Sequence, residues 1–387
     1  MSRPVLAYLD HSASAPLDKA TRAAIANALD CLGGPDALHP AGAAAAQMLA
    51  TARAQVAELI GSDPDEVIFT AGATEARNLA VKGLAAANRP LGPHVVVSAV
   101  EHPAVMSVAQ SWMRDGKPVS TAAVDQSGRI DAAALAAAVG PQTCLVSIHH
   151  GQHEVGAIQD LGTLVGAVRA QRAEVRIHVD AAESAGTLAV DVTSIGADAV
   201  SIGGTALGAP AWTGALWLRP GARLHPLIEG GAQEAGKRAG PVDLAGAVAL
   251  GHAADHTRAV LSARATRRRR QATILAERVL AVPDVRLNGP PVGERLPGHL
   301  QVSVRGVTGE SLALALATRG VCVSPGSTCS ADAGKASPTL EAMGVDAAWT
   351  RGAILMTLGD STTDDELAVA AGAFAAAVAD LRAMSPL

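Results

Sequence analysis

Short apolar runs alternate with longer helical patterns through much of the chain, and this alternation constrains the fold more than any other feature. Runs rich in Val, Ile and Ala predict strands at residues 67–70, 94–98, 144–149, 176–179, 199–202 and 214–218. The stretches between them predict helices at residues 41–61, 74–88, 104–115, 131–139 and 161–171. Strands that alternate with helices form a mostly parallel sheet covered by helices on both faces. Ligands of such α/β sheets bind at the carboxyl ends of the strands.

The rhythm changes after a long helical pattern that begins near residue 240. Beyond it the sequence predicts a strand at residues 300–304, a helix at 310–319, a strand at 354–358 and a helix at 364–384. A chain of 387 residues also exceeds the usual size of one domain. We therefore expect a large α/β domain of residues 16–258 and a small α+β domain of residues 1–15 and 259–387.

Composition and charge exclude some classes of protein. The net charge of −5 argues against a general nucleic-acid binder, which needs a basic face. The basic run Arg267–Arg270 is interpreted as a solvated helix face. No apolar stretch of membrane-spanning length stands out, and the four cysteines show no CxxC spacing. We expect a cytoplasmic protein that binds neither nucleic acid nor membrane, with Cys144 and Cys322 in the core.

The segment Phe69–Ala76 follows one predicted strand and opens the next predicted helix. Its small residues, with Ala73 and Thr74 at the turn, let the backbone approach an anion, and a helix N-terminus offers free N–H groups. An ordinary strand–helix turn with Thr74 as the N-cap would have the same pattern. The spacing alone leaves a phosphate cradle and a plain turn equally open.

Single residues at strand ends and in one loop are further candidates. His102 and Asp180 each stand at the end of a predicted strand, where such residues are more often structural than catalytic. Cys329 lies in Ser324–Asp332, a small and polar stretch typical of an exposed loop. A thiol on such a loop is a candidate nucleophile.

Three histidines close in sequence, His149, His150 and His153, invite a zinc interpretation. Their spacing matches no strong ligand motif, and a Cys or carboxylate ligand would have to come from elsewhere in the chain. We therefore predict no metal site.

Together these pieces resemble the cysteine desulfurases, a branch of the fold-type-I, class V aminotransferase superfamily. The resemblance implies the PLP-transferase fold and a dimer that builds each site from both chains. It also implies an enzyme in which pyridoxal phosphate (PLP) forms a Schiff base with a lysine, and a loop cysteine takes sulfur from the substrate as a persulfide. The landmarks occur in order along nearly the whole chain: Tyr8–Ala13 with Pro16, Asp65–Glu75, Glu101–His102, Glu154–Gly156, His178–Ala181, Gly214–Leu216, Gly230–Gly231 with Arg238, and Gly326–Ser330.

Several positions match the functional residues of that family. The resemblance places His102 on the ring of PLP, Asp180 against its pyridine nitrogen, and Ala73 and Thr74 in the turn that cradles its phosphate. It places Cys329 at the persulfide-forming cysteine. Cys329 and His102 are therefore the catalytic candidates.

Other positions depart from the family where the chemistry needs them most. The position of the Schiff-base lysine is Ala206, and Thr205 replaces the histidine before it. Gly203 replaces a phosphate-binding serine, and Pro241 a threonine that reaches the neighbouring subunit's phosphate. Leu355 replaces the arginine that would hold the substrate carboxylate, so an amino acid would enter an apolar spot unpaired.

The resemblance also places His153 and Glu183 beside the cofactor, where the family has an asparagine and a glutamine. Ala73, Thr74, His102, His153, Asp180, Glu183 and Thr205 are then the remains of a cofactor site. The only other lysine retained as a substitute for the missing one is Lys237, in a loop that resembles one near the partner subunit's site.

We predict a pseudo-desulfurase that binds no cofactor covalently. It would form a homodimer, or a heterodimer with an active desulfurase, and carry sulfur on Cys329 for an acceptor protein. Two other interpretations stay open. One is a repurposed enzyme in which His102, His153, Asp180 and Glu183 bind a metal or another ligand. The other is an active enzyme that holds PLP without a covalent bond.

Overall fold

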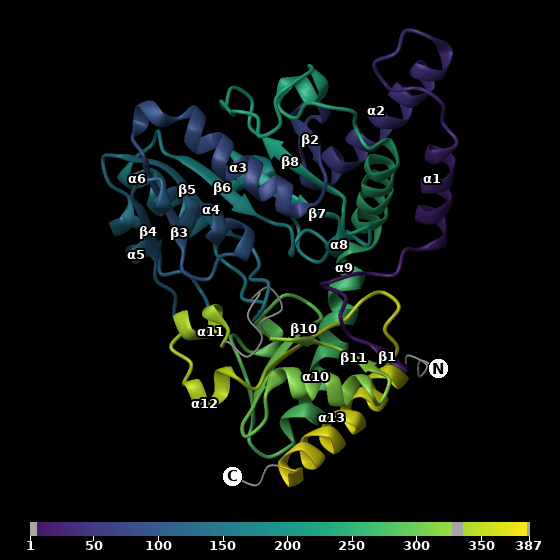
Figure 1. Ribbon diagram of the computed structural model, residues 1–387, viewed down its shortest axis with the longest axis vertical. Coiled ribbons are helices and arrows are strands. Elements are labelled where there is room, and N and C mark those ends of the chain that lie inside the picture. The colour runs from purple at the N-terminus through teal and green to yellow at the C-terminus, as the bar shows by residue number, and fades with distance from the viewer. Residues whose placement is uncertain (1–5, 327–335, 385–387) are drawn as a thin grey trace.

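The computed structural model describes residues 6–326 and 336–384, and a seven-stranded sheet forms the middle layer of the body drawn in the upper half of Figure 1. The strand order is β2 (Val67–Thr70), β8 (Gly214–Leu218), β7 (Ala199–Gly203), β6 (Arg176–Asp180), β5 (Thr143–His149), β3 (His94–Ser98) and β4 (Val119–Ala122). Neighbouring strands from β7 to β4 are parallel, and β8 alone runs antiparallel to both of its neighbours. The predicted mostly parallel sheet flanked by helices is confirmed.

Helices cover both faces of this sheet, because alternate strand residues point to opposite sides. In β3, Val96 faces one core, and Val95 and Val97 face the other. The first core packs against α2 (Pro40–Ile60), α5 (Ala132–Ala138), α6 (Leu161–Gln171) and the beginning of α9 (Leu244–Leu280). The second packs against α3 (Ala73–Ala87) and α4 (Pro103–Arg114). The sheet therefore holds its strand ends rigidly.

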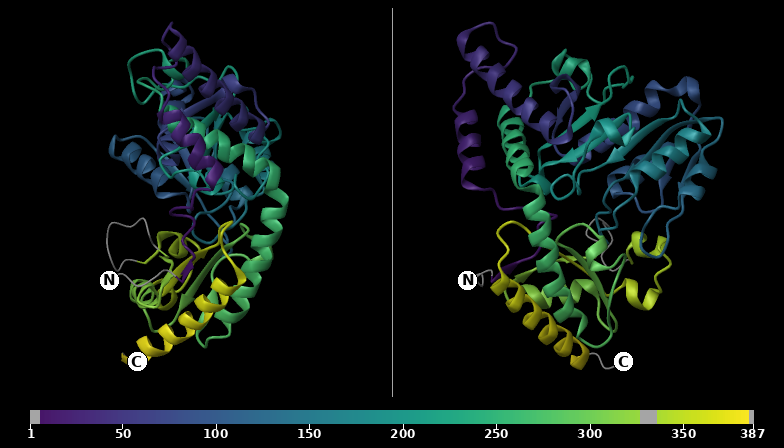
Figure 2. Two further views of the ribbon diagram at one scale, coloured as in Figure 1. Left: turned by 90° about the vertical axis from the view of Figure 1, so that its right-hand side faces the viewer. Right: turned by 180° about the vertical axis from the view of Figure 1, so that it is seen from behind.

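A smaller sheet has the order β12 (Ser324–Pro325), β13 (Ala353–Thr357), β10 (His299–Val304) and β9 (Val285–Leu287), and a separate pair joins β1 (Ala7–Tyr8) to β11 (Val321–Cys322). Around them lie α10 (Gly309–Ala317), α11 (Pro338–Ala342), α12 (Ala347–Thr350) and α13 (Asp364–Met384). The elements packed on the seven-stranded sheet form the large body, and those packed on the smaller sheets form the smaller body. Helix α9, about 55 Å long at 1.5 Å per residue, runs alongside both (Figure 2). The predicted domain division near residue 258 stays a prediction, since α9 contributes to both cores.

Among the described residues, α13 is the one helix long and apolar enough to cross a membrane by length and composition. Leu367, Phe374 and Val378 of this helix are buried in the core of the smaller body. Packing in that core accounts for part of its apolar content, since 33% of its most apolar stretch is buried.

Two expectations about single residues need correction. Cys144 is buried as expected, but Cys322 is only half-buried because its strand, β11, pairs with the short β1 alone. The basic run is not wholly solvated either, since the side chain of Arg268 is only 13% exposed. It shares the carboxylate of Asp360 with Arg264 and Arg267.

Candidate functional site

The predicted site residues gather at the carboxyl edge of the large sheet. Asp180 is the last residue of β6, and Glu183 follows it in the next turn. Thr205 and Ala206 lie in α8 (Gly204–Leu207), directly after β7. These positions meet because parallel neighbouring strands end at the same edge. The structure therefore brings these predicted residues together at one edge of the sheet, and their role as a site stays a prediction.

The centre of this edge is held by Arg77 of α3, a residue that the sequence analysis missed. Its side chain is only 3% exposed, and its Nε donates a hydrogen bond to Oδ2 of Asp180 at 2.6 Å. Its Nη2 lies 3.5 Å from Oε1 of Glu183. One signal was available in the sequence: Arg77 falls among the buried Ala76, Leu79 and Ala80, on a helix face that is otherwise apolar. A charged residue on such a face needs a charged partner.

Arg77 and Asp180 each stabilise the ionised form of the other. Burial would lower the pKa of Arg77, but Asp180 and Glu183 raise it above its usual value. Burial would also raise the pKa of Asp180, and the charge of Arg77 instead brings it below its usual value. Glu183 differs, because burial raises its pKa and Arg77 opposes this only in part. Asp180 also accepts a hydrogen bond from Ala182 N at 3.0 Å through Oδ1, so both of its oxygens have partners.

Two imidazoles stand beside the cluster as neutral rings. The centroids of His102 and His153 are 4.9 Å apart, with the planes tilted by 59°. Burial, and then the charge of Arg77, lower the pKa of His102 to about 3. Burial also lowers the pKa of His153 well below its ordinary value. His102 is the N-cap of α4 and accepts a hydrogen bond from Ala104 N through Nδ1.

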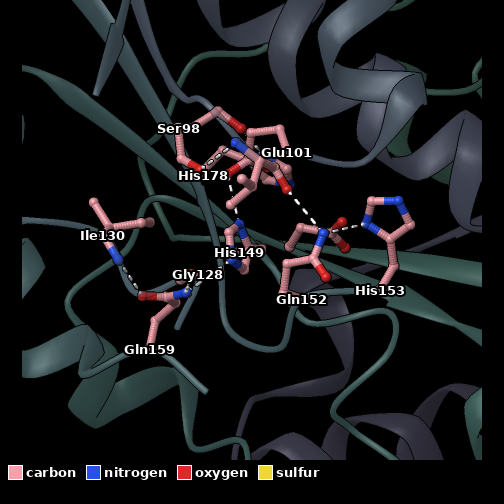
Figure 3. A network of polar contacts seen from close by, with 12 residues as sticks. Ser98, Glu101, Gly128, Ile130, His149, Gln152, His153, Gln159 and His178 are labelled. Atoms are coloured by element: carbon pink, nitrogen blue, oxygen red, sulfur yellow. Dashed lines mark hydrogen bonds and ion pairs between the residues drawn. The ribbon is translucent and has the colours of Figure 1, made fainter. Parts of the chain in front are cut away.

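The histidines considered for zinc have separate partners. His149 lies in the buried network of Figure 3, with Nδ1 2.9 Å from Glu101 Oε1 and Nε2 2.9 Å from Gln159 Nε2. The amide of Gln159 donates to Nε2, so Nδ1 carries the proton toward Glu101. His150 contacts the hydroxyl of Ser184 instead, at 3.0 Å. Within residues 6–326 and 336–384, no group of three or more His, Cys, Asp or Glu side chains is arranged to hold a metal ion.

The turn before α3 is not the ordinary strand–helix turn with Thr74 as its N-cap. Its N-cap is Gly72, and Thr74 is the second helical residue. Gly72 has φ of 98°, a conformation that threonine would adopt only with strain. The neighbouring Gly203 is tightly enclosed, because a Cβ there would lie 3.2 Å from that of Ala73 and 3.1 Å from that of Ala182. A serine at position 203 would therefore require its neighbours to shift.

The space beside Ala206 is small. Thr205, Ala206, Glu183 and Arg268 are among the residues that line a cavity of about 90 Å³, and no lysine of the described chain lines it. Pockets for small molecules usually measure roughly 300–1,000 Å³. The backbone of Ala206 is also held closely, since a Cβ on Gly186 would lie 1.9 Å from its carbonyl oxygen.

Three other positions singled out from the sequence do not line this cavity, and a fourth lies outside the described residues. Leu355 is buried in β13, paired with Gln301 and Ser324. Lys237 and Pro241 line a separate hollow of about 940 Å³ between the α1–α2 region and residues 232–245. Cys329 lies outside the described residues.

Comparison with known proteins places this geometry in a family. The family model described as "Aminotransferase class-V" matches residues 7–366. The chain is 34% identical over 381 residues to "Cysteine desulfurase IscS 1" of Archaeoglobus fulgidus, covering 98% of this chain and 99% of that protein. It is 36% identical to an "IscS-like cysteine desulfurase" of Mycobacterium tuberculosis, covering 97% of each chain. The chain belongs to the cysteine desulfurase family.

Solved structures agree with this membership. A "NIFS-LIKE PROTEIN" superposes with a TM-score of 0.91 at 26% identity, over 97% of this chain and 99% of that one. A structure described as "SspA in complex with cysteine" superposes with a TM-score of 0.79 at 28% identity, over 92% of this chain and 100% of that one. The fold of this cysteine desulfurase-family protein is therefore the PLP-dependent fold type I.

Members of the family depend on PLP, so the described residues can be tested for their fit to it. Asp180, which the resemblance assigns to the pyridine nitrogen, is already paired with Arg77 at 2.6 Å. Ala206 offers no amine for a Schiff base. The residues present in this cysteine desulfurase-family protein do not fit PLP.

Proposed function

We propose that this protein is a non-catalytic member of the cysteine desulfurase family, which pairs with an active desulfurase in the cytoplasm and accepts sulfur on Cys329. The observation that carries the proposal is the buried ion pair of Arg77 with Asp180. A carboxylate that would serve a cofactor is neutralised from within the chain. With Ala206 and Leu355 at the positions of the lysine and the arginine, neither cofactor nor substrate has its anchor.

Sulfur acceptance needs none of these lost groups. The thiolate of Cys329 would attack the outer sulfur of a persulfide on the active enzyme. The new S–S bond forms at Cys329 while the S–S bond of the donor persulfide breaks, and the donor cysteine leaves as a thiolate. The transfer is balanced without an added oxidant or reductant. It requires only a thiolate, an accessible loop and a partner surface.

The partner surface that we propose lies around the hollow lined by Lys237 and Pro241. The segment between α1 (Lys19–Leu29) and α2 exposes large apolar side chains there, with Leu32 at 79% and Leu38 at 106% of full exposure. Exposed leucines next to a large hollow are typical of surfaces that bind another chain. A second copy of this chain and an active desulfurase are both candidate partners.

The experiment mixes the protein with an active desulfurase and ³⁵S-labelled cysteine, then follows label on Cys329 by non-reducing peptide mapping. We expect label only when the active enzyme is present, and no label in Cys329→Ser. Cys31→Ser and Cys322→Ser are the matched controls, and both should keep the label. Desulfurase activity of this protein alone would refute its non-catalytic character. Absence of both label and complex would refute the partnership.

A further inference from the structure

We infer that Arg77 is a built-in occupant of the cation position beside Asp180, and that it keeps PLP and similar protonated heterocycles out even where a lysine is supplied. The inference deepens the proposed function and rests on it. It assigns the exclusion of the cofactor to Arg77 in α3, in addition to the absence of a lysine at position 206 in α8.

The contacts of Arg77 support an occupant fixed in one position. The guanidinium reaches two carboxylates from different segments, Oδ2 of Asp180 at the end of β6 and Oε1 of Glu183 in the turn after it. Its side chain is 3% exposed, and that of Asp180 is 4% exposed. A charge pair so far from water is broken only at a large cost, because each partner would be left buried and unpaired. A ligand cation therefore has to displace Arg77 before it can reach Asp180.

The surroundings offer Arg77 one weaker alternative to Asp180. Buried Ala76, Leu79 and Ala80 flank it on α3, and neutral His102 and His153 lie beside the cluster. The remaining carboxylate nearby, Glu101, contacts His149 at 2.9 Å through Oε1, while its buried Oε2 has no hydrogen-bond partner. Burial raises the pKa of Glu101, whereas Arg77 brings that of Asp180 below its usual value, so a displaced arginine would exchange an ionised partner for a less readily ionised one.

The test uses PLP as the probe and five variants of the full-length protein. Three are single variants: Ala206→Lys, Arg77→Ala and Arg77→Lys. Two are double variants: Arg77→Ala/Ala206→Lys, and Arg169→Ala/Ala206→Lys as the matched control. Arg169 pairs with Asp198 at 2.7 Å. Asp198 directly precedes β7, so this pair lies at the amino edge of the sheet, opposite the candidate site. Binding is read from visible circular dichroism, and covalent attachment from borohydride reduction followed by peptide mass spectrometry. The peptide containing position 206 separates pocket binding from modification of surface lysines.

We expect Ala206→Lys and the Arg169 control to give no adduct at position 206. The Arg77→Ala/Ala206→Lys variant should give one, as the introduced amine condenses with the aldehyde and releases water. Arg77→Ala alone should bind PLP without a covalent bond, roughly 100-fold more tightly than the unaltered protein, because a freed buried carboxylate gains a charged partner. Arg77→Lys, which keeps the cation, should bind none.

A stoichiometric adduct at position 206 in Ala206→Lys alone would overturn the inference, and this arm needs no Arg77 variant to fold. A folded double variant that still rejects PLP would overturn it as well. Neither result touches the proposed function, which fails only on desulfurase activity of the unaltered protein or on the sulfur-transfer experiment. Different results therefore refute the inference about Arg77 and the proposed function.

Discussion

Arg77 in α3 and Asp180 at the end of β6 are separated by 103 positions in the chain, yet their Nε and Oδ2 atoms lie 2.6 Å apart in the interior. This ion pair lies at the carboxyl edge of the large sheet and is formed by residues of the chain itself. The edge is where proteins of this architecture bind ligands. In this chain, the fold therefore keeps the scaffold of a cofactor site while a side chain takes the central contact.

Arg77→Ala should destabilise the protein strongly, because it leaves the buried Asp180 without its cation and the half-buried Glu183 without its neighbour. Removing one partner of a buried ion pair costs about 3–5 kcal/mol. Urea unfolding at neutral pH, followed by circular dichroism, measures the loss. Arg77→Lys should lose less, since it keeps the charge but not the planar guanidinium. An Arg77→Ala protein as stable as the parent would contradict the assignment of this pair.

The sequence alone predicted most strands of the large sheet and the helices that cover it, because these follow from hydrophobic periodicity. The candidate site residues came instead from strand-end positions and from the family resemblance, and their roles stay predictions. The sequence analysis missed β4, whose half-exposed residues at the sheet edge carry a weak apolar pattern. It also missed Arg77, although the helix around it was predicted. Periodicity shows that a charge lies on a buried face, but not which carboxylate 103 positions away receives it. That pairing depends on how α3 lies across the sheet.

Acid should destabilise the protein through its buried histidines. His178 lies between the hydroxyls of Ser147 and Ser201, and burial lowers its pKa from 6.5 to about 4. Between pH 6.5 and 4 the unfolded chain binds a proton at this residue that the folded chain does not. Stability therefore falls as the pH falls through this window and is regained above it.

His178→Gln isolates this contribution. It should reduce the number of protons taken up on unfolding at pH 5 by about one, as measured from the slope of unfolding free energy against pH. The exposed His225→Gln is the control, because its ring is in solvent both before and after unfolding. If both variants keep the slope of the parent, His178 does not stay neutral in the folded protein.

Glu154 should hold the chain that follows residue 335 against the large body. It is only 6% exposed, its Oε2 accepts from Ser337 Oγ at 2.6 Å, and its Oε1 accepts from Thr339 Oγ1 at 2.8 Å. Gln301 Nε2 also donates to Oε2, at 3.3 Å. Glu154→Ala would leave the hydroxyls of Ser337 and Thr339 buried without their acceptor, at about 1–3 kcal/mol for each group left unpaired, while Gln301 Nε2 keeps the carbonyl of Gly326 at 3.4 Å.

The loss of stability in Glu154→Ala should first appear as local opening of α11, before the whole protein unfolds. Ser337 is the N-cap of α11, accepting from Leu340 N at 3.2 Å, so its release should open that short helix first. Hydrogen exchange followed by mass spectrometry should show amides of residues 339–343 exchanging at least 10-fold faster, as expected for a loss above 1.4 kcal/mol. Glu294→Ala, which removes only the exposed pair with Arg129, should leave this segment unchanged.

Glu154→Gln should have an intermediate effect on exchange in α11, because the amide keeps one acceptor oxygen but turns a donor toward its former partners. Uniform protection across all three variants would show that Glu154 does not anchor α11.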